Sequence, residues 1–251
     1  MKVMNHKNDD EPSPIEISGT KKITFASGSS ERFVMRSVSD MHLTLVLEKN
    51  AEARCIVLGP SEHKIKIKSD LGANSKLELF GLWKNERNVE TCGMLQGEGA
   101  EYQERHVFST DSNLSLTTNI FHKAKSTKSH ALVRGVVNNA GVADVSGLVE
   151  IEKSCIGCES SLVEKILLLD AKSKARTDPK LEIQNNDVVC RHSASVSQIN
   201  EDEIFYLMSR GITRAVARSL IIDGFLESAF SSDHTVSDFD GLLFRKYWPL
   251  R

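Results

Sequence analysis

Short runs of β-forming residues recur from Lys22 to Ile199, and no convincing helical stretch interrupts them. The runs are rich in Val, Ile, Leu and Thr, and Gly, Asn, Asp and Ser separate one from the next. Apolar and polar residues alternate in several of them, as in Lys64 to Lys68, which predicts strands with one buried face and one wet face. A chain with this pattern folds into a sandwich, a barrel or a β-solenoid.

Strand-like runs return in the second half of this region at loosely similar spacings. They often follow polar clusters such as Asn138–Gly141 and Asn185–Asp187. This arrangement favours stacked coils, because each coil of a solenoid buries a face of its neighbour. The spacing is irregular, so the pattern by itself also allows a sandwich.

The two ends of the chain differ from this middle region, 21–199. Residues 1–20 are charged, contain Pro12 and Pro14 and lack periodicity, so we expect a mobile tail. The region 200–251 predicts a small helical domain. Asn200 is a suitable N-cap for a first helix, Gly211 a suitable residue to end it, and Thr213 can cap a second helix.

Composition and motifs exclude several classes of function. A net charge of -2 argues against broad binding to nucleic-acid phosphates. No apolar run is long enough to span a membrane, and the amino terminus lacks the apolar core of a secretory signal. Five cysteines without such a signal predict reduced thiols in the cytoplasm. The sequence also lacks a phosphate-binding loop, a G-x-S-x-G motif and an H-E-x-x-H motif.

Two short motifs could hold a metal. Cys155 and Cys158 form a C-x-x-C motif, which can bind zinc or an iron–sulfur cluster or act as a redox pair, but which can also be two thiols of a β-turn. Cys190 and His192 are two residues apart on an expected strand and therefore share a face. Thiolate and imidazole are common iron ligands, although such a pair also occurs by chance on a surface.

Three more histidines lie in the middle of the β-region. We expect each of these histidines to be a surface residue or a hydrogen-bonded core residue. They are His106, His122 and His130.

The stretch Leu181–Ile212 resembles the signature of the SufB/SufD family of iron–sulfur cluster assembly proteins, and so does Ala215–Glu227. Upstream, Gly147–Lys153 is similar to the last β-coils of that family. The resemblance covers roughly residues 130–230 and is weaker before them. It implies a mainly β fold, a right-handed parallel β-helix with a small C-terminal helical domain, and a non-catalytic scaffold function.

The same resemblance implies partners and a cargo. Family members pair through the β-helix, so we expect a homodimer or a heterodimer with a SufB-type paralogue. A SufC-type ABC ATPase is expected on the C-terminal helices, and the chain itself is expected to bind no nucleotide. The cargo is a transient iron–sulfur cluster of the [4Fe-4S] type. Residues expected to bind the ATPase are Ile204, Phe205, Leu207, Met208, Arg210, Gly211, Ile212, Leu220, Ile221 and Phe225.

Few functional residues of the SufB/SufD family have a counterpart in this sequence. SufD-type members have a functional histidine in a Cys-x-His stretch, which falls on His192 beside Cys190. SufB-type members have a glutamate directly after that histidine, where this chain has Ser193. The chain is therefore SufD-like, in a short form without the usual N-terminal helical domain. The essential SufB cysteine is missing, so Cys190, Cys155 or Cys158 would have to replace it.

Two other functions remain open at this point. A β-helix can also be a polysaccharide-active enzyme, which would require paired carboxylates and a basic residue across neighbouring coils, and the sequence indicates no such pair. The expected helical hairpin could be a helix-turn-helix DNA-binding unit. Its second helix has Arg214 and Arg218 but also Asp223 and Glu227, which disfavours DNA.

Overall fold

The computed structural model describes residues 14–59, 63–85 and 88–231. These residues form strands followed by two C-terminal helices, α1 and α2. The strands are β1 (Ile15–Phe25), β2 (Ser30–Leu47), β3 (Glu52–Gly59), β4 (Lys64–Leu71), β5 (Lys76–Lys84), β6 (Asn88–Leu95), β7 (Glu101–Thr110), β8 (Asn113–His122), β9 (Lys128–Val137), β10 (Val142–Ile151), β11 (Cys158–Leu168), β12 (Lys174–Ile183) and β13 (Val188–Gln198).

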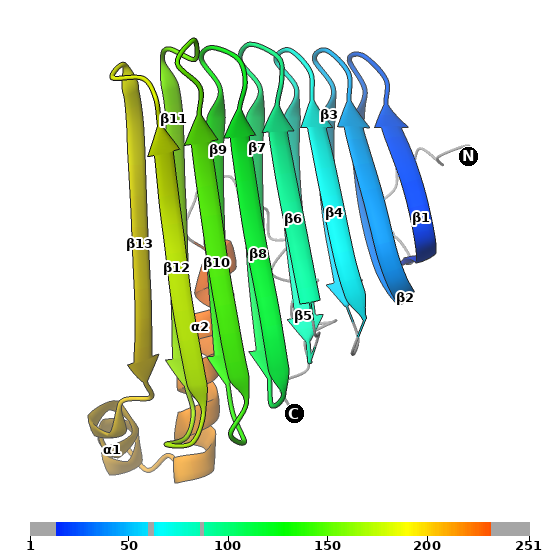
Figure 1. The fold of residues 1–251 in the computed structure, drawn as a ribbon. Coiled ribbons are helices and arrows are strands. Elements are labelled where there is room, and N and C mark those ends of the chain that lie inside the picture. The colour runs from blue at the N-terminus through cyan, green and yellow to red at the C-terminus, as the bar shows by residue number, and fades with distance from the viewer. Residues whose placement is uncertain (1–13, 60–62, 86–87, 232–251) are drawn as a thin grey trace.

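The strands wind into a parallel β-solenoid of about 6 turns. Odd-numbered strands β3 to β13 form one wall, and even-numbered strands β4 to β12 form the other (Figure 1). The long β2 belongs to both walls, because its first half pairs with β3 and its second half with β4. Every strand pair is parallel, which confirms the predicted β-helix and excludes a sandwich or a barrel of antiparallel strands.

Alternation of side chains builds the core between the walls. In β4, Ile65 and Ile67 point inward and are buried, whereas Lys64, Lys66 and Lys68 are exposed. Because parallel strands in register stack like positions, the buried residues of successive coils form columns along the solenoid. The columns make one continuous apolar core.

Asparagine and glycine form the turns between the walls. Asn50 and Asn74 have φ of 58° and 52°, a left-handed conformation that asparagine tolerates better than most residues. Asn74 stacks on Asn50 and donates a side-chain hydrogen bond to it over 3.4 Å. The number of residues per coil rises along the chain. Cys55 pairs with Leu79, 24 residues later, whereas Ala131 pairs with Leu162, 31 residues later.

The helices α1 (Glu201–Ser209) and α2 (Arg214–Ser231) form the predicted hairpin. The side chain of Asn200 caps α1 by accepting a hydrogen bond from the Asp202 amide at 2.9 Å. Gly211 follows α1 with φ of 84°, and the Thr213 hydroxyl accepts from the Val216 amide at 3.4 Å. These three features confirm the cap and turn residues expected from the sequence.

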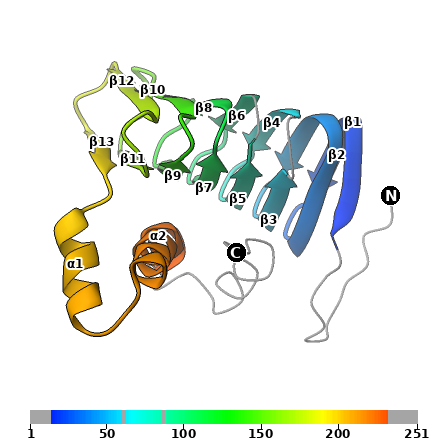
Figure 2. The ribbon, with the colours of Figure 1, turned by 90° about the horizontal axis from the view of Figure 1, so that it is seen from below.

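Helix α2 lies on the outer face of the odd-numbered wall (Figure 2). Outward-facing apolar residues of that wall and the inner side of the hairpin form a second core, which includes Phe80, Leu132, Val136, Leu226 and Phe230. The rings of Phe80 and Phe230 stack with centroids 6.0 Å apart. The hairpin is therefore held to the solenoid by apolar packing.

Two arginines add polar links between the wall and α2. Arg134 of β9 donates to the Phe225 carbonyl at 3.2 Å and lies against the Phe225 ring. Arg218 of α2 donates to the Leu169 carbonyl, just after β11. A displacement of α2 would therefore strain its contacts with β9 and with the end of β11.

The amino-terminal boundary differs from the expectation. Strand β1 begins at Ile15, so residues 15–20 belong to the solenoid and not to a mobile tail. They are ordered by pairing with β2 and by burial of Ile17. The rest of the expected tail, residues 1–13, and the end of the expected helical domain, 232–251, lie outside the described residues. None of the described helices is long and apolar enough to cross a membrane.

Candidate functional site

Among the residues that the structure describes, the last coil, formed by β12 and β13, has a neighbouring coil on one side only (Figure 1). We call it the open end. Cys190 and His192 lie on β13, in register with Ser160 and Leu162 of β11. Both β11 residues point inward and are buried, so Cys190 and His192 share the inward face, as their spacing predicted. His192 is exposed and Cys190 is half-buried, because no further coil covers them in the chain described here.

Burial controls the chemistry of Cys190. It raises the pKa of the thiol, the nearby Cys158 raises it further, and the Ser160 backbone lowers it. The thiol is therefore protonated at neutral pH, and a metal must displace that proton to bind.

Cys155 and Cys158 lie deeper, at the turn between β10 and β11, and both are fully buried and unbridged. The Cys155 thiol donates to the His122 carbonyl at 3.3 Å, and burial raises its pKa. The Cys158 thiol lies 3.2 Å from the Thr127 hydroxyl and donates to the Ala124 carbonyl at 3.4 Å. Both thiols thus have local partners.

The four candidate ligands do not converge on one point. In the ranges 14–59, 63–85 and 88–231, no group of three or more His, Cys, Asp or Glu side chains could hold a metal ion. His192 and Cys190 share one surface at the open end, while Cys155 and Cys158 lie inside the preceding coil. The open end by itself therefore provides part of a coordination sphere.

A string of polar side chains runs from this end into the core. Ser160, beneath Cys190, lies 2.7 Å from the Ser129 hydroxyl, and Ser129 lies 2.9 Å from Nε2 of His122. Nδ1 of His122 is 2.7 Å from the Thr127 hydroxyl. His122 is thus a hydrogen-bonded core histidine, as expected, and burial lowers its pKa to about 4.

His122 should make the fold sensitive to acid. Its pKa is about 4 in the folded chain and about 6.5 when unfolded, so the unfolded chain takes up the proton first and stability falls as pH drops from 6.5 towards 4. We expect His122 to account for a loss of about 2 kcal/mol between pH 7 and 5. Urea unfolding at both values should show this loss, and a His122→Gln variant should lack it. An equal loss in the variant would contradict the assignment.

A second buried polar network lies in the middle of the solenoid and was not expected from the sequence. Trp83 Nε1 donates to Nδ1 of His106 at 3.2 Å, so Nε2 of His106 carries the proton and donates to Glu104 at 3.2 Å. Tyr102 donates to the same Glu104 oxygen at 2.9 Å. Residues 102, 104 and 106 are two apart, which puts them on one face of a strand. This spacing was the one signal in the sequence that could have indicated the network. This network confirms His106 as a satisfied core histidine.

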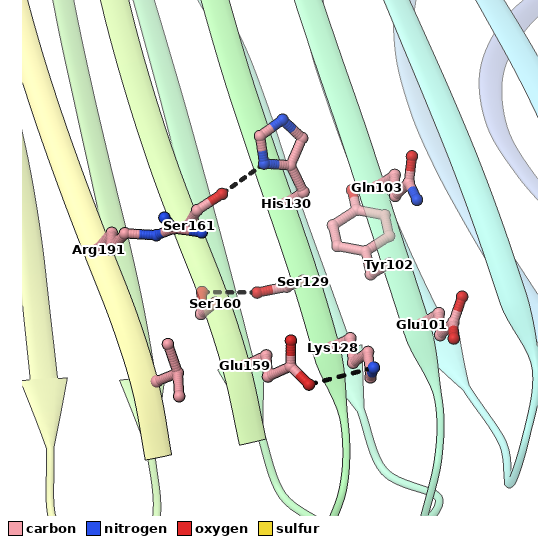
Figure 3. Close-up of a pocket in the computed structure, with 11 residues that line it drawn as sticks. Glu101, Tyr102, Gln103, Lys128, Ser129, His130, Glu159, Ser160, Ser161 and Arg191 are labelled. Carbon is pink, nitrogen blue, oxygen red and sulfur yellow. Dashed lines mark hydrogen bonds and ion pairs between the residues drawn. The ribbon is translucent and has the colours of Figure 1, made fainter. Parts of the chain in front are cut away.

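The outer face of the odd-numbered wall has a shallow hollow of about 160 Å³ (Figure 3). Gln103, His130, Ser161 and Arg191 form one row across four strands, and His130 contacts the Ser161 hydroxyl. Figure 3 shows this row beside a second, charged row.

The charged row bears on the polysaccharide-enzyme alternative. Glu101 and Glu159 lie two coils apart with Lys128 between them, which is the pattern such an enzyme would need. Glu159 pairs with Lys128 at 3.1 Å and Glu101 with Lys76 at 3.7 Å. Each carboxylate is thus engaged by a lysine, Glu101 by Lys76 and Glu159 by Lys128, and the two do not face each other across an open cleft.

The hairpin exposes apolar side chains, which we call the helical patch. Phe205 is 71% exposed and Tyr206 57%. The patch consists of Phe205, Tyr206, Met208, Val216 and Leu220.

The structure separates the residues expected to bind an ATPase into exposed ones, which include members of the helical patch, and ones that pack against the solenoid. Ile204 is fully buried in the second core and supports the hairpin from below. Four others are half-buried against that core, namely Leu207, Ile212, Ile221 and Phe225. Arg210 and Gly211 are exposed at the turn, and Arg210 lies over the Tyr206 ring.

Comparison with known proteins gives a consistent family. The family model described as "SUF system FeS cluster assembly, SufBD core domain" matches residues 15–225. An iron–sulfur cluster assembly SufBD family protein of Mycobacterium tuberculosis is 34% identical over 117 residues, 47% of this chain and 14% of that protein. A protein of the same description from Staphylococcus epidermidis is 32% identical over 136 residues, 53% of this chain and 29% of the relative.

The iron–sulfur cluster assembly protein SufD of Bacillus subtilis is 30% identical over 159 residues, 62% of this chain and 36% of SufD. The chain thus matches between 14% and 36% of the length of these three curated relatives.

Proposed function

Because the chain belongs to the SufBD family of iron–sulfur cluster assembly proteins, we propose that it is a non-catalytic scaffold that holds a nascent cluster at its open end. The observation that carries the proposal is the uncovered last coil, which presents His192 and Cys190 on its inward face. An ABC ATPase bound to the helical patch would drive the assembly.

The open end is suited to bind a second subunit. Ile183 and Val196, both at inward positions of the last coil, are 39% and 40% exposed, which is unfavourable in water. Strands β12 and β13 are also the edges of their walls, with backbone groups that a further strand could pair. A second copy or a SufB-type paralogue stacked here would bury these residues and place His192 at the subunit contact.

The ligands at this end suit a cargo that is passed on. Imidazole nitrogen and thiolate sulfur both bind iron, and a second chain could complete the coordination of a [4Fe-4S] cluster. Burial raises the pKa of Cys190, so iron would have to displace the proton of its thiol. Competition between the proton and iron would suit a cargo that is passed on.

The hairpin provides the connection to the ATPase. Its exposed face offers aromatic and aliphatic anchors, while its inner face is fixed to β9 and β11 through the second core, Arg134 and Arg218. The sequence has no phosphate-binding loop, so nucleotide hydrolysis would be supplied by the partner. Movement of the ATPase would then be transmitted to β11. Strand β11 pairs with β13, the strand on which His192 lies.

Anaerobic reconstitution with iron and sulfide tests the proposal. The purified chain should become brown and oxygen-sensitive, and His192→Ala should reduce bound iron to about a tenth, because a ligand is lost. His42→Ala is the matched control, since His42 is an exposed histidine of β2 at the other end of the solenoid. A colourless wild-type product without bound iron would contradict the proposal.

A further inference from the structure

Glu164 is an unusual residue to find in the core of the solenoid. It lies on β11 in the coil before the open end, at an inward position, and its side chain is fully buried. The inward neighbours on its own strand are Leu162 and Ile166, and Val133 lies beneath it on β9. An apolar residue would fit this environment at a lower free energy.

Neither carboxyl oxygen of Glu164 has a hydrogen-bond partner among the residues that the structure describes. The Asp178 backbone lies close enough to favour the charged form, but without the geometry of a full hydrogen bond. Elsewhere in this core the rule is different, since Glu104 is bonded by both Tyr102 and His106. The core therefore gives one oxygen of Glu104 two hydrogen-bond partners, whereas neither oxygen of Glu164 has one.

Burial, and to a lesser degree the charge of Asp178, raises the pKa of Glu164 to about 7. The carboxyl group is therefore partly protonated at neutral pH and ready to exchange its proton for a cation.

Small residues surround the carboxyl group. A Cβ on Gly147 of β10 would lie 2.9 Å from Oε1 of Glu164, so the group extends across the core to the opposite wall in space that only glycine leaves free. On the side of the open end, Glu164 is in register with the small residue Ala194 of β13.

His192 is two residues from Ala194 on the same strand and faces the same way. Diagonal neighbours on adjacent strands are roughly 7–8 Å apart at their Cα atoms, a span that a glutamate and a histidine bridge easily through one metal ion. Glu164 and His192 are therefore diagonal neighbours on adjacent strands, both at inward positions.

We propose that Glu164 is a second protein ligand for the iron that His192 binds at the open end. The inference rests on the proposed scaffold function and assigns it an inner oxygen ligand. When Fe²⁺ binds, the carboxylic acid gives its proton to water and an oxygen–iron bond replaces the O–H bond, without any change of oxidation state. The remaining ligands would come from water or sulfide and from a second subunit.

The test is anaerobic titration of the full apo-chain with Fe²⁺, beside urea unfolding without metal. We expect Glu164→Leu to unfold at a higher urea concentration than wild type and to bind Fe²⁺ roughly tenfold more weakly. Glutamine has the same shape as glutamate, and Glu164→Gln should bind Fe²⁺ as weakly as Glu164→Leu. The glutamine variant therefore tests the inference if the leucine variant does not fold. Glu104→Gln is the control buried carboxylate, and its Fe²⁺ affinity should equal that of wild type.

The outcomes separate the inference from the proposed function. If His192→Ala loses Fe²⁺ while both Glu164 variants bind as wild type does, the inference is overturned and the scaffold function stands. If wild type itself binds no Fe²⁺, both are overturned. A Co²⁺ complex whose visible spectrum changes on Glu164→Gln, and not on Glu104→Gln, would support direct ligation.

Discussion

A Gly97→Ala variant should lose more than about 4 kcal/mol of its free energy of unfolding, enough to leave much of the chain unfolded at 25 °C. The new Cβ would lie 2.0 Å from the Ala73 amide nitrogen and 2.3 Å from the Gly72 carbonyl carbon. These are backbone atoms of the preceding turn, and Gly97 is tied to the same coil by a hydrogen bond to Leu71. The clash cannot be relieved without separating two coils.

Urea unfolding followed by circular dichroism measures the effect. Gly224→Ala is the matched control, because nothing lies within 4 Å of its Cβ position and the residue is in the middle of α2. That variant should be more stable than wild type by about 1 kcal/mol, the difference in helix propensity. An unfolding midpoint for Gly97→Ala equal to wild type would show that the turns are not packed as described.

Phe205→Glu should abolish co-purification with a SufC-type ATPase while leaving the fold intact. Phe205 is 71% exposed, so the substitution costs little folding free energy, but it puts a charge into the helical patch. A central aromatic anchor contributes at least about 2 kcal/mol to binding, so affinity should fall about 30-fold or more.

Val38→Glu is the control for this experiment. Val38 is also an exposed apolar residue, at 45%, and it lies on β2, far from the hairpin in the coil stack. That variant should bind the ATPase normally. Deleting the whole hairpin would be less informative, since Ala217, Leu226 and Ala229 are buried against the wall and their loss would expose the second core. Unchanged co-purification of Phe205→Glu would place the ATPase elsewhere.

Much of the fold could be read from local pattern. The alternation in β4 and the caps of α1 and α2 are local signals, and the structure confirms them. Within the β-region, strands β6, β7 and β8 are the least evident from local pattern, because several of their inward positions are polar and break the apolar alternation. These polar inward residues are Thr91, Glu104, His106 and Thr118. Only the neighbouring coils show that such residues are satisfied inside.

The candidate site was predictable in part. Cys190 and His192 were expected to share a face because strand geometry alone requires it, and they do. Their position at the end of the stack depends on how many coils the chain makes, which no local pattern records. Glu164 is embedded in the largely apolar run 162–169, where local pattern does not tell which face of the strand it takes. Its burial depends on the register between β11 and β13.

Each coil of the solenoid contacts only the coils before and after it, and this has a dynamic consequence. The terminal coil has half the stabilising contacts of an internal one, so it should fray at a lower free energy than the middle of the stack. The segment that carries His192 should thus exchange its amide hydrogens earlier than the coils in the middle of the stack. Whatever caps it, whether protein or metal, gains the ability to set how often that segment opens.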